Sequence, residues 1–268
     1  LAAGLLVALL LVLAVLALGV GAVRIAPGRV IEVLGAALSG EREALQSREG
    51  LIVLSIRLPR LLLGALIGAA LAVSGALMQG LFRNPLAAPD LLGVSSGAGL
   101  GAALALLLGA GAALVQGAAF VGGLAAGGLA VACATLTRSG DGRLALILCG
   151  VVAGALASAG LGLVVIAADP WSQLPSITYW LLGSFTRATL TEAVGALIPV
   201  GLGAAVLIWL GFRLDILSLG DEQARSLGLP ARPLRLLALA AAALMTSSAV
   251  AVAGVVGWIG LLAPHAAR

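Results

Sequence analysis

Long runs without a charged residue alternate with short polar segments along the whole chain. At about 1.5 Å of rise per residue, a run of roughly 20 residues forms a helix that crosses the hydrocarbon core of a bilayer. The pattern predicts membrane-spanning helices within residues 1–23, 61–82, 91–109, 113–136, 144–168 and 190–212, and further helix within 236–267. The last run is too short for two full spans, so we expect about eight spans, with the last one short or cut.

The polar segments predict smaller elements outside the hydrocarbon core. Residues 24–56 carry charges around a helical apolar pattern, which indicates a loop with a surface helix. Asp169 and the proline after it end the fifth run, and residues 171–186 predict a short helix at the membrane surface. Residues 213–235 form a charged loop in which 217–228 is expected to be a short helix.

The composition agrees with this pattern. Hydrophobic residues make up 62% of the chain and charged residues 10%, whereas a soluble domain is about half apolar and a quarter charged. Long alternating patterns typical of barrel strands are absent from the sequence. We therefore expect an all-α integral membrane protein, a polytopic helix bundle that forms a single transmembrane domain over residues 1–268 and contacts membrane lipid.

Three of the runs carry small residues at every fourth position, a spacing that lets helix backbones approach closely. One row comprises residues 64, 68, 72, 76 and 80, and a second comprises 93, 97, 101, 105 and 109. The third row, on the fifth run, comprises Gly150, Gly154, Ser158 and Gly162. A smooth face with one hydroxyl either lines a translocation path or serves close packing, and the sequence leaves both open.

Several function classes are disfavoured. The net charge of +4 comes from arginines scattered through the loops, which does not indicate a nucleic-acid site. The chain has no lysine and so cannot supply the Walker A lysine of an ATPase. Residues 72–75 lack the first glycine of a nucleophile motif, and His265 is expected to be a helix-end residue rather than a catalytic one. Cys133 and Cys149 are interpreted as packing residues, and no metal or cofactor site is predicted.

Ion-coupled carriers normally bury ionisable groups in their spans, but before His265 the predicted spans contain only Glu192, near the start of 190–212. A secondary carrier is therefore the weaker hypothesis.

Five stretches resemble the signatures of a known family. They are RLPR (57–60), SGALMQGLFRNPLAAPDLLGVSSGAG (74–99), YWLLGS (179–184), LSLGDEQARSLGLP (217–230) and VAVAGVVGWIGLLAPHAAR (250–268). In this order they resemble the permease subunits of ABC importers for iron-siderophores, haem and cobalamin. The resemblance implies a homodimer in the bacterial inner membrane, two ATPase subunits, a periplasmic substrate-binding protein and about ten spans, so that the C-terminal spans are absent here.

The resemblance also implies roles for individual residues. Arg57 and Arg60 would dock the binding protein, although boundary arginines also snorkel to headgroups. Asn84 and Leu86 would belong to a cytoplasmic gate, and residues 139–142, the second gate turn, depart from the cobalamin permease. The ATPase would couple to a short helix through Gly220, Glu222, Ala224, Arg225, Gly228 and Pro230.

Two alternatives remain open at this stage. The 217–230 helix could be an ordinary solvated loop helix. The whole protein could be an ATP-independent channel or a secondary carrier. Arginine counts on the two sides of the membrane are too even to decide the topology, so the cytoplasmic placement of 83–90 and 213–235 comes from the resemblance alone.

Overall fold

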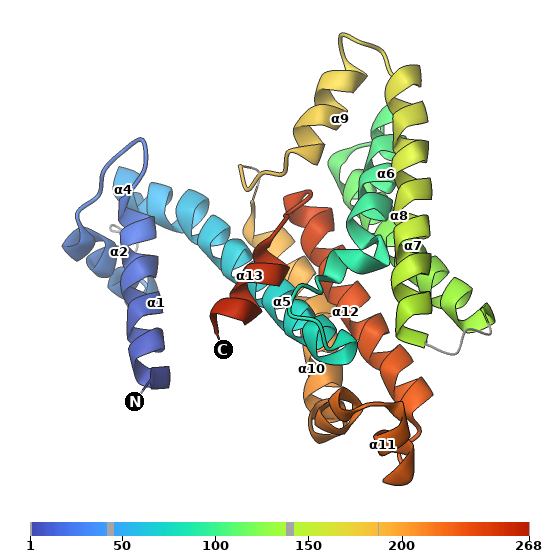
Figure 1. Ribbon diagram of the computed structural model, residues 1–268. Helices are drawn as coiled ribbons and strands as arrows, with labels where there is room; N and C mark the ends of the chain where they lie inside the picture. Colours follow the sequence, from blue (N-terminus) through green and yellow to red (C-terminus); the bar gives the residue numbers. More distant parts are fainter. Residues whose placement is uncertain (1, 42–45, 138–141, 187, 268) are drawn as a thin grey trace. The chain divides into compact units, whose positions relative to one another are not determined.

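The computed structural model describes residues 2–41, 46–137, 142–186 and 188–267, and all regular structure in these ranges is helical (Figure 1). The elements are α1 (Ala2–Gly19), α2 (Pro27–Ser39), α4 (Arg48–Leu51), the π-helix η1 (Ile52–Arg57), α5 (Leu58–Phe82), the 3-10 helix η2 (Pro89–Leu92), α6 (Val94–Leu107), α7 (Ala112–Leu136), α8 (Gly142–Ala167), α9 (Gln173–Leu181), α10 (Leu190–Leu219), α11 (Asp221–Ser226), α12 (Ala231–Ala253) and α13 (Ile259–Ala266). The predicted all-α class is confirmed.

Five helical segments are long and apolar enough to cross a membrane: Arg48–Phe82, Ala112–Leu136, Gly142–Ala167, Leu190–Leu219 and Ala231–Ala253. Shorter apolar helices occupy Gly4–Gly19 and Val94–Leu107. A polytopic helical membrane protein is thus confirmed, but eight spans are not. In the last uncharged run, one long helix ends at Gly254, and Trp258, with a φ of 67°, precedes only the eight-residue α13.

The chain divides into two compact units. Unit 1 comprises residues 1–66 and 185–195, and unit 2 comprises residues 67–184 and 196–268. The single transmembrane domain expected from the sequence stays a prediction.

Unit 1 is built around an apolar cluster that joins α1, α2 and η1. Its buried members are Leu18, Ile25, Val30, Val33 and Val53. The amphipathic α2 is the surface helix predicted within 24–56: Pro27 occupies its first turn and Gly40 ends it with a φ of 75°. The rest of that segment differs from the prediction, because helix resumes at Arg48 and continues without a break into α5.

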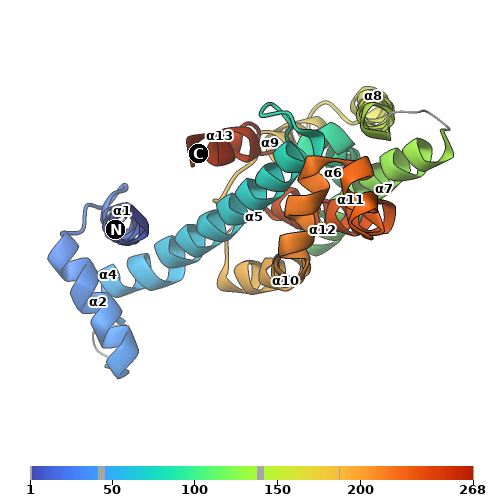
Figure 2. The ribbon, with the colours of Figure 1, turned by 60° about the horizontal axis from the view of Figure 1, so that its bottom comes forward.

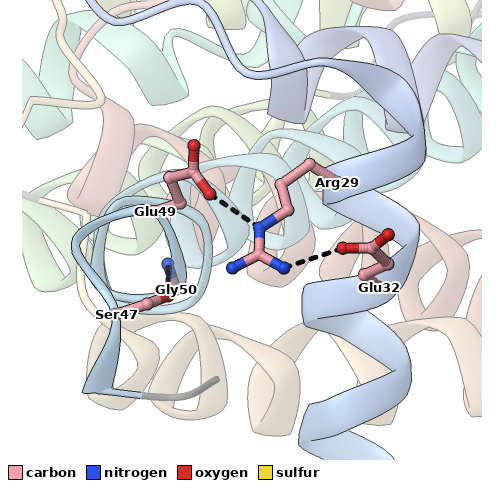
Figure 3. Close-up of polar contacts among 5 residues, drawn as sticks. All are labelled: Arg29, Glu32, Ser47, Glu49 and Gly50. Carbon is pink, nitrogen blue, oxygen red and sulfur yellow. Dashed lines mark hydrogen bonds and ion pairs between the residues drawn. The ribbon is translucent and has the colours of Figure 1, made fainter. Parts of the chain in front are cut away.

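A charged contact ties α2 to the start of α4. Arg29 lies between two carboxylates and contacts Glu32 and Glu49, each at 2.7 Å (Figure 3). These contacts, first the one with Glu32, raise the pKa of the Arg29 guanidinium. Ser47 caps α4 by accepting a hydrogen bond from the Gly50 amide at 3.0 Å. The start of the long helix is therefore fixed by a cap and an ion pair.

Unit 2 depends on close contacts between helix backbones. Helices α6, α7 and α8 lie side by side, and α12 packs against α6 and α7 (Figures 1 and 2). A Cβ built at Gly97 would overlap the Gly122 carbonyl oxygen, and one at Gly101 would overlap that of Ala118. Gly97 and Gly101 of the predicted row 93–109 therefore pack closely, as expected, whereas a Cβ at Gly109 would meet nothing within 4 Å.

The glycines of the row predicted on α5 do not pack closely against other described residues. Gly68 and Gly80 have no atom within 4 Å of a built Cβ, whereas Gly75, which lies outside the row, would overlap the Gly260 carbonyl oxygen of α13. Gln79 on the same helix donates to the Leu261 carbonyl at 3.1 Å. The face of α5 that packs is thus set by its partner α13 rather than by the regular spacing of small residues.

The loop between α8 and α9 follows the prediction. Asp169 accepts hydrogen bonds from the amides of Trp171 at 3.1 Å and Ser172 at 2.7 Å, and from the Ser172 hydroxyl. These bonds, above all those from Ser172, lower the pKa of the Asp169 carboxyl. The expected short helix in 171–186 is α9, which packs on α6 through Ile177.

Gly150 provides a direct test of backbone packing in unit 2. A Cβ built there would overlap the Leu91 carbonyl oxygen, whereas a Cβ at Gly162, on the same helix, meets nothing within 4 Å. We expect Gly150→Ala to cost about 1–3 kcal/mol because overpacking forces backbone shifts. Gly162→Ala should be neutral or slightly stabilising, since alanine favours helix. Thermal unfolding of the purified protein in detergent should show a lower midpoint for the first variant only. Equal midpoints would contradict this packing.

Candidate functional site

Two polar turns meet at one end of unit 2. The Arg83 side chain, just past α5, donates from Nε to the Ser218 carbonyl of α10 at 2.5 Å. Arg232, at the start of α12, reaches the Thr135 carbonyl near the end of α7 at 3.5 Å. At the opposite end of α6, Gln173 donates to the Leu107 carbonyl at 2.8 Å. The 83–90 turn and the segment between α10 and α12 therefore lie at one end of this unit. That segment is shorter than the predicted loop 213–235, because α10 continues to Leu219 and α12 begins at Ala231.

The turn after α5 is shaped by Asn84. Its side-chain oxygen accepts a hydrogen bond from the Leu86 amide at 2.9 Å, and its carbonyl accepts one from the Ala87 amide at 3.0 Å. Asn side chains commonly form turns in this way, by a hydrogen bond to the backbone two residues further on. It leaves the Leu86 side chain 72% exposed. Asn84 therefore has a turn-forming role and Leu86 a projecting one; their gate function stays a prediction. Of the second predicted gate turn, 139–142, residues 139–141 lie outside the described residues.

The predicted coupling residues lie together on and around α11. Gly220, with a φ of 122°, is the N-cap, and Gly228, with a φ of 77°, ends the helix before Pro230. Glu222 and Arg225 are exposed. The expected short helix is therefore present, with a residue of glycine-favouring backbone conformation at each end.

Ala224 plays a different part from its neighbours on α11. Its side chain has 0% exposure and so faces the chain's own interior. A bulky side chain there would disturb the packing of α11 itself, not only a surface against a partner. Of the six coupling residues predicted, Ala224 holds the helix in place, and Glu222 and Arg225 provide its outer surface.

Arg57 and Arg60 start from the same helix but reach different neighbours in unit 1. The π-helix η1 precedes Pro59, whose ring cannot accept the normal helical approach of the carbonyl four residues earlier. Pro59 lies inside the continuous helical segment Arg48–Phe82. The helix is irregular up to Arg57, and the guanidinium groups of Arg57 and Arg60 reach different carbonyls.

Arg57 is half-buried, and its side chain binds the backbone at the end of α1 and just after it. Its guanidinium donates to the carbonyls of Leu18 and Val23, and a Cβ at Gly21 would lie 2.7 Å from one of its nitrogens. Arg60 is exposed and donates to the Thr186 carbonyl at 2.9 Å. Arg57 thus has a structural role, and Arg60 is the more accessible of the two predicted docking residues.

The row on α8 is divided by the structure. Gly150 and Gly154 face the segment that begins α6: a Cβ at Gly154 would lie 3.4 Å from the Gly93 Cα. Ser158 and Gly162 are exposed. Close packing therefore explains the first half of the row and leaves only the second half as an open surface for a translocation path.

The sequence did not single out two features of unit 2. Thr246, Ser247 and Ser248 form a buried polar stretch on α12. In the sequence, this stretch is indicated by three consecutive hydroxyl residues inside an apolar run. The other feature is the contact of Arg83 with Ser218, which the sequence does not indicate.

A cluster of metal-binding side chains does not mark the site in the described residues. In the part of the chain that is described, no group of three or more His, Cys, Asp or Glu side chains is placed to hold a metal ion. A groove of about 340 Å³ between α5 and α10 is lined mostly by apolar or small residues, among them Ala76, Gly80 and Leu207, with Asp215 and Ser218 also in its wall. The candidate site is therefore a set of surfaces at the ends of the helices.

Comparison with known proteins identifies the family of the chain. The profile of the FecCD transport family matches residues 9–268. The chain is 33% identical over 261 residues to the molybdate import system permease protein MolB of Haemophilus influenzae, covering 97% of this chain and 76% of that protein. It is 43% identical to the hemin transport system permease protein HmuU of Yersinia pestis, covering 81% of this chain and 66% of the relative.

A third relative is the cobalamin import system permease protein BtuC of Halobacterium salinarum, 40% identical, with 81% of this chain and 58% of that protein covered. The chain thus spans between 58% and 76% of the length of these relatives. A solved structure, described as an inward-facing conformation of an ABC transporter of the metal-chelate type, superposes with a TM-score of 0.83 at 31% identity, covering 98% of this chain and 79% of that one. By its sequence and its fold, this chain belongs to the FecCD transport family.

Proposed function

We propose that this chain is the membrane-spanning permease subunit of a binding-protein-dependent ABC importer. It works as a homodimer in the bacterial inner membrane, with two copies of an ATPase subunit on the cytoplasmic side and a periplasmic substrate-binding protein on the other. The observation that supports this most directly is α11, a short helix with glycines at both ends and Glu222 and Arg225 on its outer surface. A chain without lysine must receive the work of ATP hydrolysis through such a contact.

The cargo that we propose is a large iron chelate, either a siderophore complex or haem, or cobalamin. The names of the hemin and cobalamin relatives support this class, and the molybdate relative widens it to a metal oxoanion. The exposed half of the α8 row, Ser158 and Gly162, would line the path beside the second copy of the chain. Such small side chains bind weakly, so specificity would lie in the binding protein.

An ATP-independent channel or carrier is the alternative. Apart from Glu192, in the first turn of α10, the predicted spans before His265 lack the ionisable groups that ion coupling uses, which favours the ATP-driven hypothesis. The two kinds of partner would use different exposed side chains. The ATPase would contact Glu222 and Arg225 of unit 2, and the binding protein would contact Arg60 of unit 1.

Uptake into vesicles separates the two hypotheses. The full-length protein would be reconstituted with its ATPase and binding protein, and uptake of labelled haem, cobalamin, a ferric hydroxamate siderophore and molybdate would be measured. We expect uptake of one of these only when the ATPase and hydrolysable ATP are both present. Uptake at the same rate with a non-hydrolysable ATP analogue, or without the ATPase, would show a channel or carrier instead.

Arg60 provides the test of binding-protein docking. Arg60→Glu should weaken association of the binding protein by several-fold at low salt, because an exposed charge pair contributes modestly and is screened. Arg24→Glu is the matched control, since Arg24 is also an exposed arginine of unit 1. Titration of the binding protein against the reconstituted complex measures the affinity.

Arg57→Glu is a poorer test of docking, because it also removes the donors to Leu18 and Val23 and should lower the thermal midpoint. If Arg60→Glu and Arg24→Glu change the affinity equally, or not at all, Arg60 does not dock the binding protein.

A further inference from the structure

Helix α5 ends in a hydrogen-bond pattern that normally calls for glycine. The Arg83 amide donates to the Gly80 carbonyl at 3.3 Å, and the Asn84 amide donates to the Gln79 carbonyl at 3.2 Å. This is the Schellman motif, whose first residue after the helix adopts a left-handed backbone. That residue is Arg83, with a φ of 51°. The left-handed conformation costs a residue with a Cβ about 1–2 kcal/mol.

Other helices of the described chain use glycine at this place. In α11 the Gly228 amide donates to Arg225 at 2.9 Å and the Leu229 amide donates to Ala224 at 2.9 Å, with Gly228 in the left-handed conformation. The residues that follow α2 and α9, Gly40 and Gly183, have φ values of 75° and 72°. The backbone at the end of α5 therefore gives no reason for arginine, and the reason lies in its side chain.

The Arg83 side chain reaches the junction between α10 and α11, inside the same unit. Its Nε–H donates to the Ser218 carbonyl at 2.5 Å, at the carbonyl end of α10, where the helix dipole favours a cation. Its guanidinium also covers Gly220: a Cβ built there would lie 2.8 Å from the Arg83 Nη2. Gly220, with a φ of 122°, is the residue from which α11 starts.

The contact joins two segments that the proposed function treats as separate. On one side it begins at the residue directly before Asn84, whose side chain shapes the turn that exposes Leu86. On the other side it ends at the glycine on which α11 would hinge. A displacement of α11 would thus act on the turn through one side chain, without passing through the packed helices of unit 2.

We propose that Arg83 is a positioning residue that carries movement of α11 to the 83–90 turn. This inference rests on the proposed function, because it is the ATPase that would move α11. Arg83 is exposed to solvent and forms no ion pair with a described residue. The link acts through hydrogen-bond geometry at a helix end and through contact with a glycine.

Arg83→Gly isolates this role from folding. Glycine is the preferred residue for the left-handed position, so α5 should end as before while the guanidinium is lost. The matched control is Arg213→Gln, which removes another cation from the last part of α10. Arg213 stacks on Trp209, 4.8 Å from the ring centroid, and donates to the Trp209 carbonyl, all within its own helix.

The measurement is hydrogen exchange of the reconstituted full-length complex with its ATPase, with and without ATP and vanadate, in peptides covering 83–92 and 217–230. In the wild type and in Arg213→Gln, we expect nucleotide to change exchange in both peptides. In Arg83→Gly the change should persist in 217–230 and shrink about fivefold or more in 83–92, the low end of typical coupling between sites.

The outcomes separate the two proposals. If the wild-type chain does not bind the ATPase, the proposed function fails and this inference fails with it. If it binds and both peptides of Arg83→Gly respond as in the wild type, the proposed function stands and the role of Arg83 is refuted. An unresponsive 83–92 peptide in the wild type would refute it as well.

Discussion

Close contact between helix backbones is the constraint on which unit 2 depends. Lipid tails are as apolar as the side chains of the spans, so burial of apolar area does little to hold helices together in a bilayer. Packing takes its place, and the contacts of Gly97 with Gly122 and of Gly150 with Leu91 leave no room for a methyl group. Each contact lies beside the segment that links α5 to α6. The bundle therefore holds that segment rigidly on one side.

Beside this bundle, α11 is a short element between two glycines. It has six residues, an inward-facing Ala224 and a glycine of positive φ at each end. A short element on such ends can be displaced as a body without unwinding its neighbours. The contrast between tightly packed spans and a short helix between two glycines is what a coupling element needs. The Arg83 contact is the proposed route from this helix to the 83–90 turn.

Much of the fold could be predicted from the sequence, because the solvent imposes a simple rule. An uncharged run of about 20 residues must satisfy its own backbone, so the positions of α5, α7, α8, α10 and α12 were evident. Helix partners were harder to predict. The regular small row on α5 lies open while Gly75 packs on α13, because small residues occur on more than one face and the sequence does not say which face meets a partner.

The candidate site shows the same limit. Arg57 and Arg60 look equivalent in the sequence, and they differ because Arg57 donates to the carbonyls of Leu18 and Val23, which lie far away along the chain. Ala224 matched a coupling signature, yet its side chain is buried. The motifs correctly placed α11 and the Asn84 turn. Only the three-dimensional structure distinguishes the residues that face outward from those that hold each element in place.

Site-specific photo-cross-linking tests the central proposal, contact between α11 and an ATPase, most directly. A benzoylphenylalanine would replace Glu222 in the reconstituted full-length complex and, in a control variant, would replace Leu163, which is 70% exposed on α8. Irradiation should link the chain to the ATPase from position 222 and not from position 163. An ATP-driven complex that gives no link from 222, or equal links from both positions, would contradict the assignment of α11 as the coupling helix.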